Sequence, residues 1–168
     1  TRLDEIVFQH AGGPLPGRKV KGVIPGGMSM PILPVSQLDV PMANEFLKER
    51  KTMLGTGGVM VLDDTTCMVR VGCVITYFFR DESCGQCTQC REGTGWLEKI
   101  MQRIERGAGS FADLDILLDV AGKMEGQTIC AFADAAAWPV QGLLRHFRED
   151  FEAHITHGKC PFPQSFEL

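Results

Sequence analysis

The chain has 168 residues, 44% of them hydrophobic and 23% charged, with a formal net charge of −4. This length fits about one domain, or two small ones, with a real hydrophobic core, and the composition argues against a disordered tail, a collagen-like fibre and an integral membrane protein. An isoelectric point near 5.5 also argues against a protein that binds nucleic acid by neutralising phosphates.

Residues 1–64 have the turn-rich pattern of a small α+β domain. Glycine and proline gather in three segments, at 11–17, 24–27 and 55–58. The apolar runs between them, Val20–Ile24 and Val59–Leu62, predict strands, because glycine and proline supply the dihedral angles that turns require. Helices are expected at Leu3–His10 and from Pro41 to Lys51, where proline suits a first helical turn.

Residues 65–157 change to the period of helices. Apolar residues recur every three or four positions from Met68 to Phe78, from Leu97 to Ile104 and from Leu114 to Ala121. A fourth helix is expected from Ala133 to beyond Phe151, with Pro139 in its first turn or at a bend. Four helices with short connections indicate a bundle, and residues 158–168 are expected to form an irregular tail.

The chemistry of the chain concentrates in a loop that carries Cys84, Cys87 and Cys90. Two consecutive C-x-x-C spacings place three thiolates on one segment, so one further ligand is needed for a four-ligand site. Zinc sites usually take their cysteines as two separated pairs, whereas three tandem cysteines with one remote cysteine are typical of a [4Fe–4S] cluster. The spacing therefore favours an iron–sulfur cluster over zinc.

Four other cysteines are candidates for the remaining ligand. Cys67 and Cys73 lie in an apolar helical stretch and are interpreted as buried small hydrophobic side chains. Cys160 precedes Pro161, as in the Cys-Pro ending of bacterial ferredoxin motifs. Cys130 falls between two predicted helices, where it can meet the first loop at one end of a bundle. Spacing alone favours Cys130 and leaves Cys160 open.

The cysteine loop and its surroundings resemble a known family. The segments Glu82-Ser83-Cys84-Gly85-x-Cys87-Thr88-x-Cys90-Arg91-Glu92-Gly93, Ile129-Cys130 and Asp134-Ala135-Ala136-Ala137-Trp138-Pro139-Val140-Gln141-Gly142 are similar to the C-terminal half of the NADH-binding flavoprotein subunits of respiratory complex I. Related diaphorase subunits occur in NAD-reducing hydrogenases and formate dehydrogenases. The upstream segments 10–13, 23–27 and 54–58 look like the β-grasp, ubiquitin-like, soluble-ligand-binding domain of the same family.

The resemblance implies a fold, a ligand set and a role. The fold would be α+β, a β-grasp domain followed by a four-helix iron–sulfur bundle. The family's cluster ligands fall on Cys84, Cys87, Cys90 and Cys130. In the family, reduced FMN passes single electrons to one [4Fe–4S] cluster, which passes them to a partner iron–sulfur subunit toward quinone. A small [2Fe–2S] subunit is a further expected partner, within a peripheral arm on the cytoplasmic side of the bacterial inner membrane or on the mitochondrial matrix side.

The chain also departs from the family pattern. Gln89 stands where the family usually has proline, and Met28-Ser29 stands where it usually has two serines. No segment matches the glycine-rich flavin and NADH domain, so the chain is expected to be a fragment that does not turn over alone, with FMN and NADH on the missing N-terminal part. Its own glycine runs fit no nucleotide-binding motif and are interpreted as turns.

Several residues near the cysteines carry lesser expectations. Arg91 would offer positive charge to an anionic cluster or lie solvated at the surface, and Trp96 and Ile129 would keep water from the sulfurs. Ala131 and Phe132 would face the flavin edge. Trp96 and Trp138 are otherwise expected as core aromatics, and His154 and His157 as a solvated helix end. Two rival functions remain, a zinc- or thiol-stapled interaction module and the same relay in a hydrogenase or formate dehydrogenase.

Overall fold

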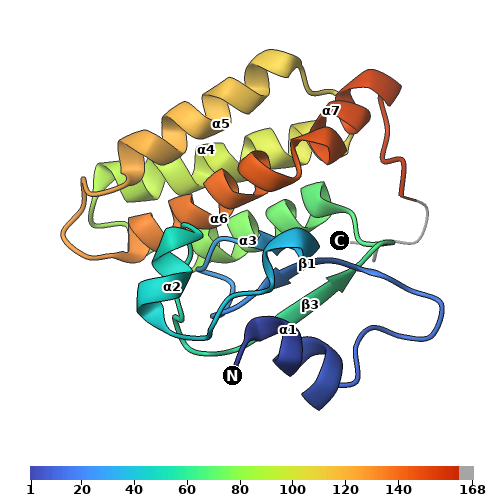
Figure 1. Ribbon diagram of the computed structural model, residues 1–168. Coiled ribbons are helices and arrows are strands. Elements are labelled where there is room, and N and C mark those ends of the chain that lie inside the picture. The colour runs from blue at the N-terminus through green and yellow to red at the C-terminus, as the bar shows by residue number, and fades with distance from the viewer. Residues whose placement is uncertain (163–168) are drawn as a thin grey trace. The chain divides into compact units, whose positions relative to one another are not determined.

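The computed structural model describes residues 1–162 and divides into two compact units between Thr66 and Cys67 (Figure 1). The change in hydrophobic period predicted this boundary two residues earlier, between residues 64 and 65. Helices and a small antiparallel sheet make up the described chain. The part of the predicted tail at residues 163–168 lies outside the described residues.

The first unit contains a three-stranded antiparallel sheet in the order β2-β1-β3. Its strands are β1 (Val20–Ile24), β2 (Leu33–Pro34) and β3 (Met60–Asp63). The predicted first strand is confirmed over its full length, and the second begins one residue later than expected. The two-residue strand β2 was not predicted, because so short a segment beside proline has no detectable alternation. It pairs through Gly22 with Pro34 and through Val23 with Leu33.

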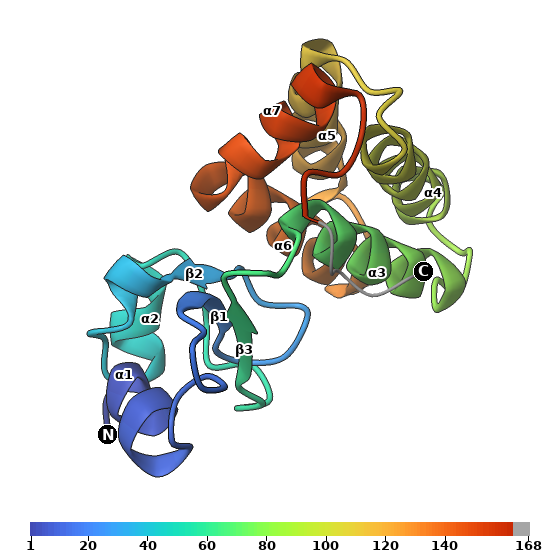
Figure 2. The same cartoon turned by 90° about the vertical axis from the view of Figure 1, so that its right-hand side faces the viewer.

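Helical segments lie beside this sheet, and Figure 2 shows α1 and α2 on the same side of β1 and β3. They are α1 (Leu3–Glu5), the π-helix η1 (Ile6–His10), the 3-10 helix η2 (Val35–Gln37) and α2 (Asn44–Glu49). The helix expected from Pro41 is shorter, because Pro41 pairs with Arg2 in an isolated bridge and α2 starts only after Ala43. Buried side chains from several of these elements form one core: Leu3, Val7, Val20, Val23, Leu33, Leu38, Val40 and Leu47.

Two of the glycine runs meet within this unit. The amide of Thr56 donates a hydrogen bond to the carbonyl of Gly26 at 3.0 Å, and a methyl group at Gly26 would overlap the backbone of Leu54. The glycines therefore allow two loops to pack backbone against backbone.

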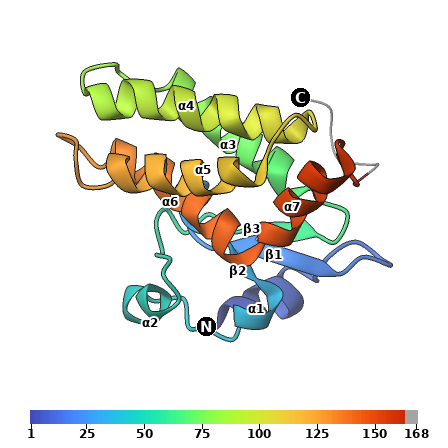
Figure 3. The same ribbon diagram turned by 90° about the horizontal axis from the view of Figure 1, so that it is seen from above.

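The second unit is a helical bundle. It contains α3 (Met68–Asp81), α4 (Thr88–Glu105), α5 (Phe111–Met124), α6 (Phe132–His146) and α7 (Arg148–His157). Helix α3 packs on α4, α4 on α5 and α5 on α6, and α6 returns to α3, so four helices close around a common core (Figure 3). That core includes Leu97, Met101, Ile104, Leu114, Leu117, Val140 and Leu143, all nearly or fully buried.

The prediction of four helices was wrong, because the expected last helix is two helices. The helix is interrupted at Phe147, whose φ of −133° and ψ of 27° are not helical. Pro139 lies buried in the interior of α6, and the helix continues through it to His146. Phe147 and Phe151 are both buried, so the apolar period runs across the break and conceals it from the sequence. Within residues 1–162, none of the helices combines the length and apolar character that a membrane crossing requires.

Candidate metal centre

Three of the predicted ligands lie where α3 gives way to α4. Cys84 lies in the connecting loop, Cys87 is the N-cap of α4, and Cys90 lies in the first turn of that helix. Gly85 has a φ of 77°, a conformation that glycine adopts without a steric penalty, and it lets the chain turn between the first two cysteines. The guanidinium of Arg91 donates a hydrogen bond to the Gly85 carbonyl at 2.6 Å, which ties the loop to the helix.

The fourth predicted ligand, Cys130, lies in the loop between α5 and α6. Figures 1 and 3 show this loop and the α3–α4 loop at the same end of the bundle. The Cys130 carbonyl accepts a hydrogen bond from the Thr128 hydroxyl at 2.8 Å. The base of the loop is closed by the amide of Gly126, which donates to the Asp134 carboxylate at 2.6 Å.

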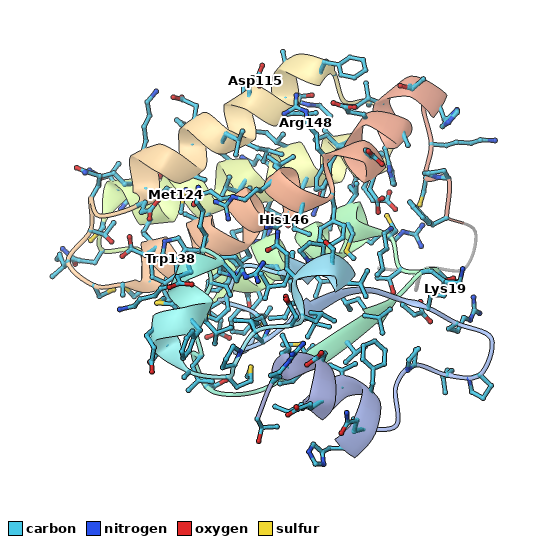
Figure 4. The ribbon with its side chains drawn as sticks, in the orientation of Figure 1. Lys19, Asp115, Met124, Trp138, His146 and Arg148 are labelled. Carbon is cyan, nitrogen blue, oxygen red and sulfur yellow. The ribbon has the colours of Figure 1, made fainter. Side chains whose placement is uncertain are left out.

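Side chains of α6 hold the start of this loop. Trp138, labelled on α6 in Figure 4, donates its indole N–H to Glu125 at 2.8 Å, and Gln141 donates to the other Glu125 oxygen at 3.0 Å. These two bonds lower the pKa of Glu125, with the Gln141 bond as the larger cause. The prediction of Trp138 as a core aromatic was wrong, because this side chain is half-buried and links α6 to the end of α5.

The four predicted ligands line one cavity of about 170 Å³. Glu82, Thr128 and Phe132 complete the lining. Phe132 meets Phe79 edge to face, with ring centroids 5.3 Å apart, and Phe79 is buried in α3. The bundle core therefore supports one apolar wall of the cavity.

The electrostatics of the cavity centre on Cys90, which is buried, whereas Cys84 and Cys130 are exposed. Burial raises the pKa of the Cys90 thiol, and nearby Cys130, Cys84 and Cys87 raise it further, while the Ser83 hydroxyl, 3.4 Å from the sulfur, lowers it. Four thiolates held around one small cavity repel one another, so nearby positive charge is needed to stabilise them together. The N-terminus of α4, where Cys87 and Cys90 lie, supplies part of that charge through its helix dipole.

This donor set fits an iron–sulfur cluster. Four cysteine sulfurs around a small, partly apolar cavity are the ligands that a [4Fe–4S] cluster takes, one sulfur for each iron. The Ser83 hydroxyl lies 3.4 Å from the Cys90 sulfur, and hydrogen bonds to the sulfurs are a usual means of tuning such clusters.

Two residues expected to shield the sulfurs do not line this cavity. Ile129 is 84% exposed and Trp96 is 54% exposed, so the prediction that they keep water from the site, and that of Trp96 as a core aromatic, were wrong. Phe132, which packs against Phe79, forms the apolar wall instead. Trp96 and Gln89 line a separate hollow between α4 and α5.

Arg91 is neither a buried charge nor a free surface cation. Besides its bond to Gly85, its Nε atom lies 2.9 Å from a carboxylate oxygen of Glu92. It therefore holds the cysteine loop while its side chain stays half-exposed.

Helix α4 is brought close to α5 by Gly93. A methyl group at Gly93 would overlap the side chain of Met124, which Figure 4 labels near the end of α5. This close approach sets the distance between the first turn of α4, with Cys90, and the helix that leads into the Cys130 loop.

The remaining three cysteines lie away from this cavity. Cys73 is buried in α3, and burial raises the pKa of its thiol to about 12, so it is a small core side chain as predicted. Cys67 is likewise buried, but it lies beside His154 and Cys160, and the three potential ligand atoms are all within 4.8 Å of one another.

The prediction of a solvated pair of histidines was therefore wrong for His154. This side chain is fully buried, whereas His157 is exposed. Helical spacing relates His154 only to its neighbour His157, whereas Cys67, which lies beside it in the fold, is 87 residues away in the sequence. In the sequence, the separation of six residues between His154 and Cys160 is a local sign of this group of potential metal ligands.

The chain is similar to proteins of a known family. A family model described as the NADH-ubiquinone oxidoreductase-F iron-sulfur binding region matches residues 72–154. An F-type NADH-quinone oxidoreductase subunit of Rhizobium meliloti (strain 1021) is 50% identical over 160 residues, which are 95% of this chain and 38% of the relative. The F-type subunit of Rickettsia conorii is 46% identical over 91% of this chain and 37% of its own length. The chain thus spans less than two-fifths of the length of these relatives.

Solved structures show the same fold in another setting. An NAD⁺-reducing [NiFe]-hydrogenase in the H₂-reduced state superposes with a TM-score of 0.81 and 33% identity, over 92% of this chain and 26% of that chain. The air-oxidised state gives a TM-score of 0.80 and 31% identity, over 100% of this chain and 27% of that chain.

Proposed function

The chain belongs, through residues 72–154, to the NADH-ubiquinone oxidoreductase-F iron–sulfur binding family, and on that premise we propose that it is the electron-relay portion of an NADH dehydrogenase flavoprotein subunit. The observation that carries the proposal is the single cavity lined by Cys84, Cys87, Cys90 and Cys130. These four residues would hold one [4Fe–4S] cluster.

When bound, such a cluster takes up and releases one electron at a time. The protein's contribution is to hold it in position and to tune it. The first turn of α4 directs its positive dipole end toward the sulfurs, the Ser83 hydroxyl adds a hydrogen bond to Cys90, and Phe132 limits the access of water from the bundle side. None of the chain's own residues is assigned a catalytic role.

The rest of the electron path lies beyond this chain. FMN and NADH would be bound by the N-terminal part of the subunit, and Ala131 and Phe132 would face the flavin edge. The electrons would pass to an iron–sulfur subunit, with a small [2Fe–2S] subunit as a further partner, in a peripheral arm on the cytoplasmic side of the bacterial inner membrane. The curated relatives, which are F-type subunits of NADH-quinone oxidoreductases, support this assignment.

The domain roles follow from the same premise. Residues 65–157 would be the cluster-binding domain. Residues 1–64 would belong to a β-grasp domain of the soluble-ligand-binding type, which the small antiparallel sheet with its covering helical segments supports at a coarser level.

One specific observation favours a second host. The hydrogenase structures superpose over nearly the whole chain, which suits the same relay in a hydrogenase diaphorase. The higher sequence identity to the quinone oxidoreductase subunits favours complex I.

The first experiment is an analysis of iron, zinc and acid-labile sulfide in the anaerobically prepared natural protein. We expect about four irons and four sulfides for each cluster bound at these cysteines. Because a cluster with three cysteine ligands is held less well, Cys130→Ser should lose most of the iron of this cluster.

Cys160→Ser is the control, because Cys160 does not line the cavity. It should keep the iron content of the unsubstituted protein. Equal iron retention in Cys130→Ser and Cys160→Ser would contradict the ligand assignment, and zinc without sulfide at this cavity would support the structural-staple alternative instead.

A further inference from the structure

A second group of metal-binding side chains lies at the other end of helix α3. Cys67 is the N-cap of this helix, His154 lies in α7, and Cys160 follows the end of α7. Their sulfur and nitrogen atoms all lie within 4.8 Å of one another. Helix α3, with 14 residues, is about 21 Å long, so this group is distinct from the cavity that follows the helix's other end.

The orientation of His154 is that of a metal ligand. Its Nδ1 atom lies 2.7 Å from the carbonyl of Asp150, one helical turn earlier, and only an Nδ1–H can make a hydrogen bond to a carbonyl. In the neutral ring, Nε2 then carries the lone pair, and it lies 3.4 Å from the Cys67 sulfur. A backbone carbonyl that fixes the tautomer in this way is the usual outer partner of a metal-bound histidine.

The distance between the His154 Nε2 atom and the Cys67 sulfur also suits two ligands of one metal ion. Zinc lies ~2.3 Å from sulfur and ~2.0 Å from nitrogen in a tetrahedral site, which puts the two ligand atoms ~3.5 Å apart. The observed 3.4 Å therefore needs little adjustment.

The surroundings stabilise thiolates at this place only in part. The amide of Arg70 donates to the Cys67 sulfur at 3.4 Å from the first turn of α3, whereas the Arg70 guanidinium, which also interacts electrostatically with Cys67 and Cys160, is ion-paired with Glu105. Without a metal, burial raises the pKa of the Cys67 thiol to about 12, and the adjacent Cys160 adds to the shift. A dication would supply the positive charge that two neighbouring thiolates require.

The position of Cys160 is set by close backbone packing. Gly158 ends α7 in a left-handed conformation, with a φ of 62°. The turn between α4 and α5 packs against it at Gly107, where a methyl group would overlap the Gly158 carbonyl. The chain is therefore directed back toward Cys67 by the bundle itself.

We infer that Cys67, His154 and Cys160 form a zinc site, separate from the iron–sulfur cavity, that joins the start of α3 to the end of α7. Two thiolates and one imidazole are soft and borderline donors, which suit zinc and not magnesium or calcium. A water molecule would complete the tetrahedral coordination of the ion. Binding releases two thiol protons for each Zn²⁺ taken up.

The test measures zinc and iron together in the natural protein, in its assembled form. We expect about one zinc beyond any bound by partner subunits, and we expect Cys160→Ser to lose it. The iron content should stay unchanged, which also shows that the bundle is folded. Cys73→Ser is the control, because Cys73 is a buried thiol of α3 that lies outside the group.

Zinc X-ray absorption on the unsubstituted protein supplies a readout that does not depend on a variant folding. We expect two sulfur neighbours at ~2.3 Å and lighter neighbours at ~2.0 Å. Four sulfur neighbours would mean that zinc has replaced the cluster, and would overturn the inference. So would zinc that persists undiminished in Cys160→Ser, or protein that takes up no zinc when Zn²⁺ is added under reducing conditions.

Discussion

At the scale of single residues, Arg91 has two roles. It holds the loop that carries the cysteines, and it places a positive charge near the proposed cluster. Its guanidinium donates a hydrogen bond to the carbonyl of Gly85, which lies between Cys84 and Cys87 in the loop. Because a four-thiolate cluster gains negative charge on reduction, a nearby cation stabilises the reduced form. Arg91→Gln should lower the reduction potential, by an amount on the order of tens of mV for a half-exposed charge, as measured by redox titration followed by electron paramagnetic resonance.

Arg106→Gln provides the matched control. Arg106 follows the last residue of α4 and lies about 24 Å along the helix axis from Cys90. Like Arg91, it donates a hydrogen bond to a neighbouring residue, here to the Gln102 side chain. It should leave the potential unchanged. An equal shift in both variants would mean that overall charge, and not the contact with the loop, sets the potential.

At the scale of elements, Gly107 connects the α4–α5 turn to the end of α7. It has a φ of 74° and packs against the backbone of Gly158. Gly107→Ala should destabilise the protein by about 2–4 kcal/mol, because a left-handed alanine and an overlap with a backbone carbonyl both cost free energy. The thermal unfolding midpoint should fall, and zinc should be lost with the displaced Cys160.

Gly126→Ala separates the two causes. Gly126 also has a positive φ, of 70°, but a methyl group there would meet nothing within 4 Å. Its cost should therefore be about 1–2 kcal/mol, from the backbone conformation alone. If the two alanine variants lowered the midpoint equally, the close packing of Gly107 would contribute nothing.

The contrast between the α6–α7 break and the strands shows what periodicity can and cannot predict. Val20–Ile24 lies between turn residues, so its pattern is local and the strand was predicted in full. The break at Phe147 leaves the apolar period intact, since the residue stays buried, and was missed. The cysteine loop was recognised because its three cysteines, Cys84, Cys87 and Cys90, are close in sequence. The group of Cys67, His154 and Cys160 depends on a contact over 87 residues, which only the packed bundle reveals.

At the scale of the whole helical unit, the two proposed metal sites lie at opposite ends of the bundle. The cavity cysteines lie on loops at one end, with Cys84 and Cys130 exposed. The second group, with buried Cys67 and His154, ties α3 to α7 at the other end. Between them lies an apolar core that includes Leu97, Met101, Leu117 and Leu143, and we expect its buried apolar area to keep it packed without a metal.

Removing iron should therefore loosen only one end of the bundle. In hydrogen–deuterium exchange of iron-depleted against intact protein, residues 82–90 and 126–132 should exchange faster, because their loops lose the cluster that joins them. Residues 147–160 should be unchanged while zinc is kept, since local opening depends on the contacts of each segment. Faster exchange throughout α3 to α7 would show instead that the core depends on the cluster, and that the two ends of the bundle unfold as one cooperative unit.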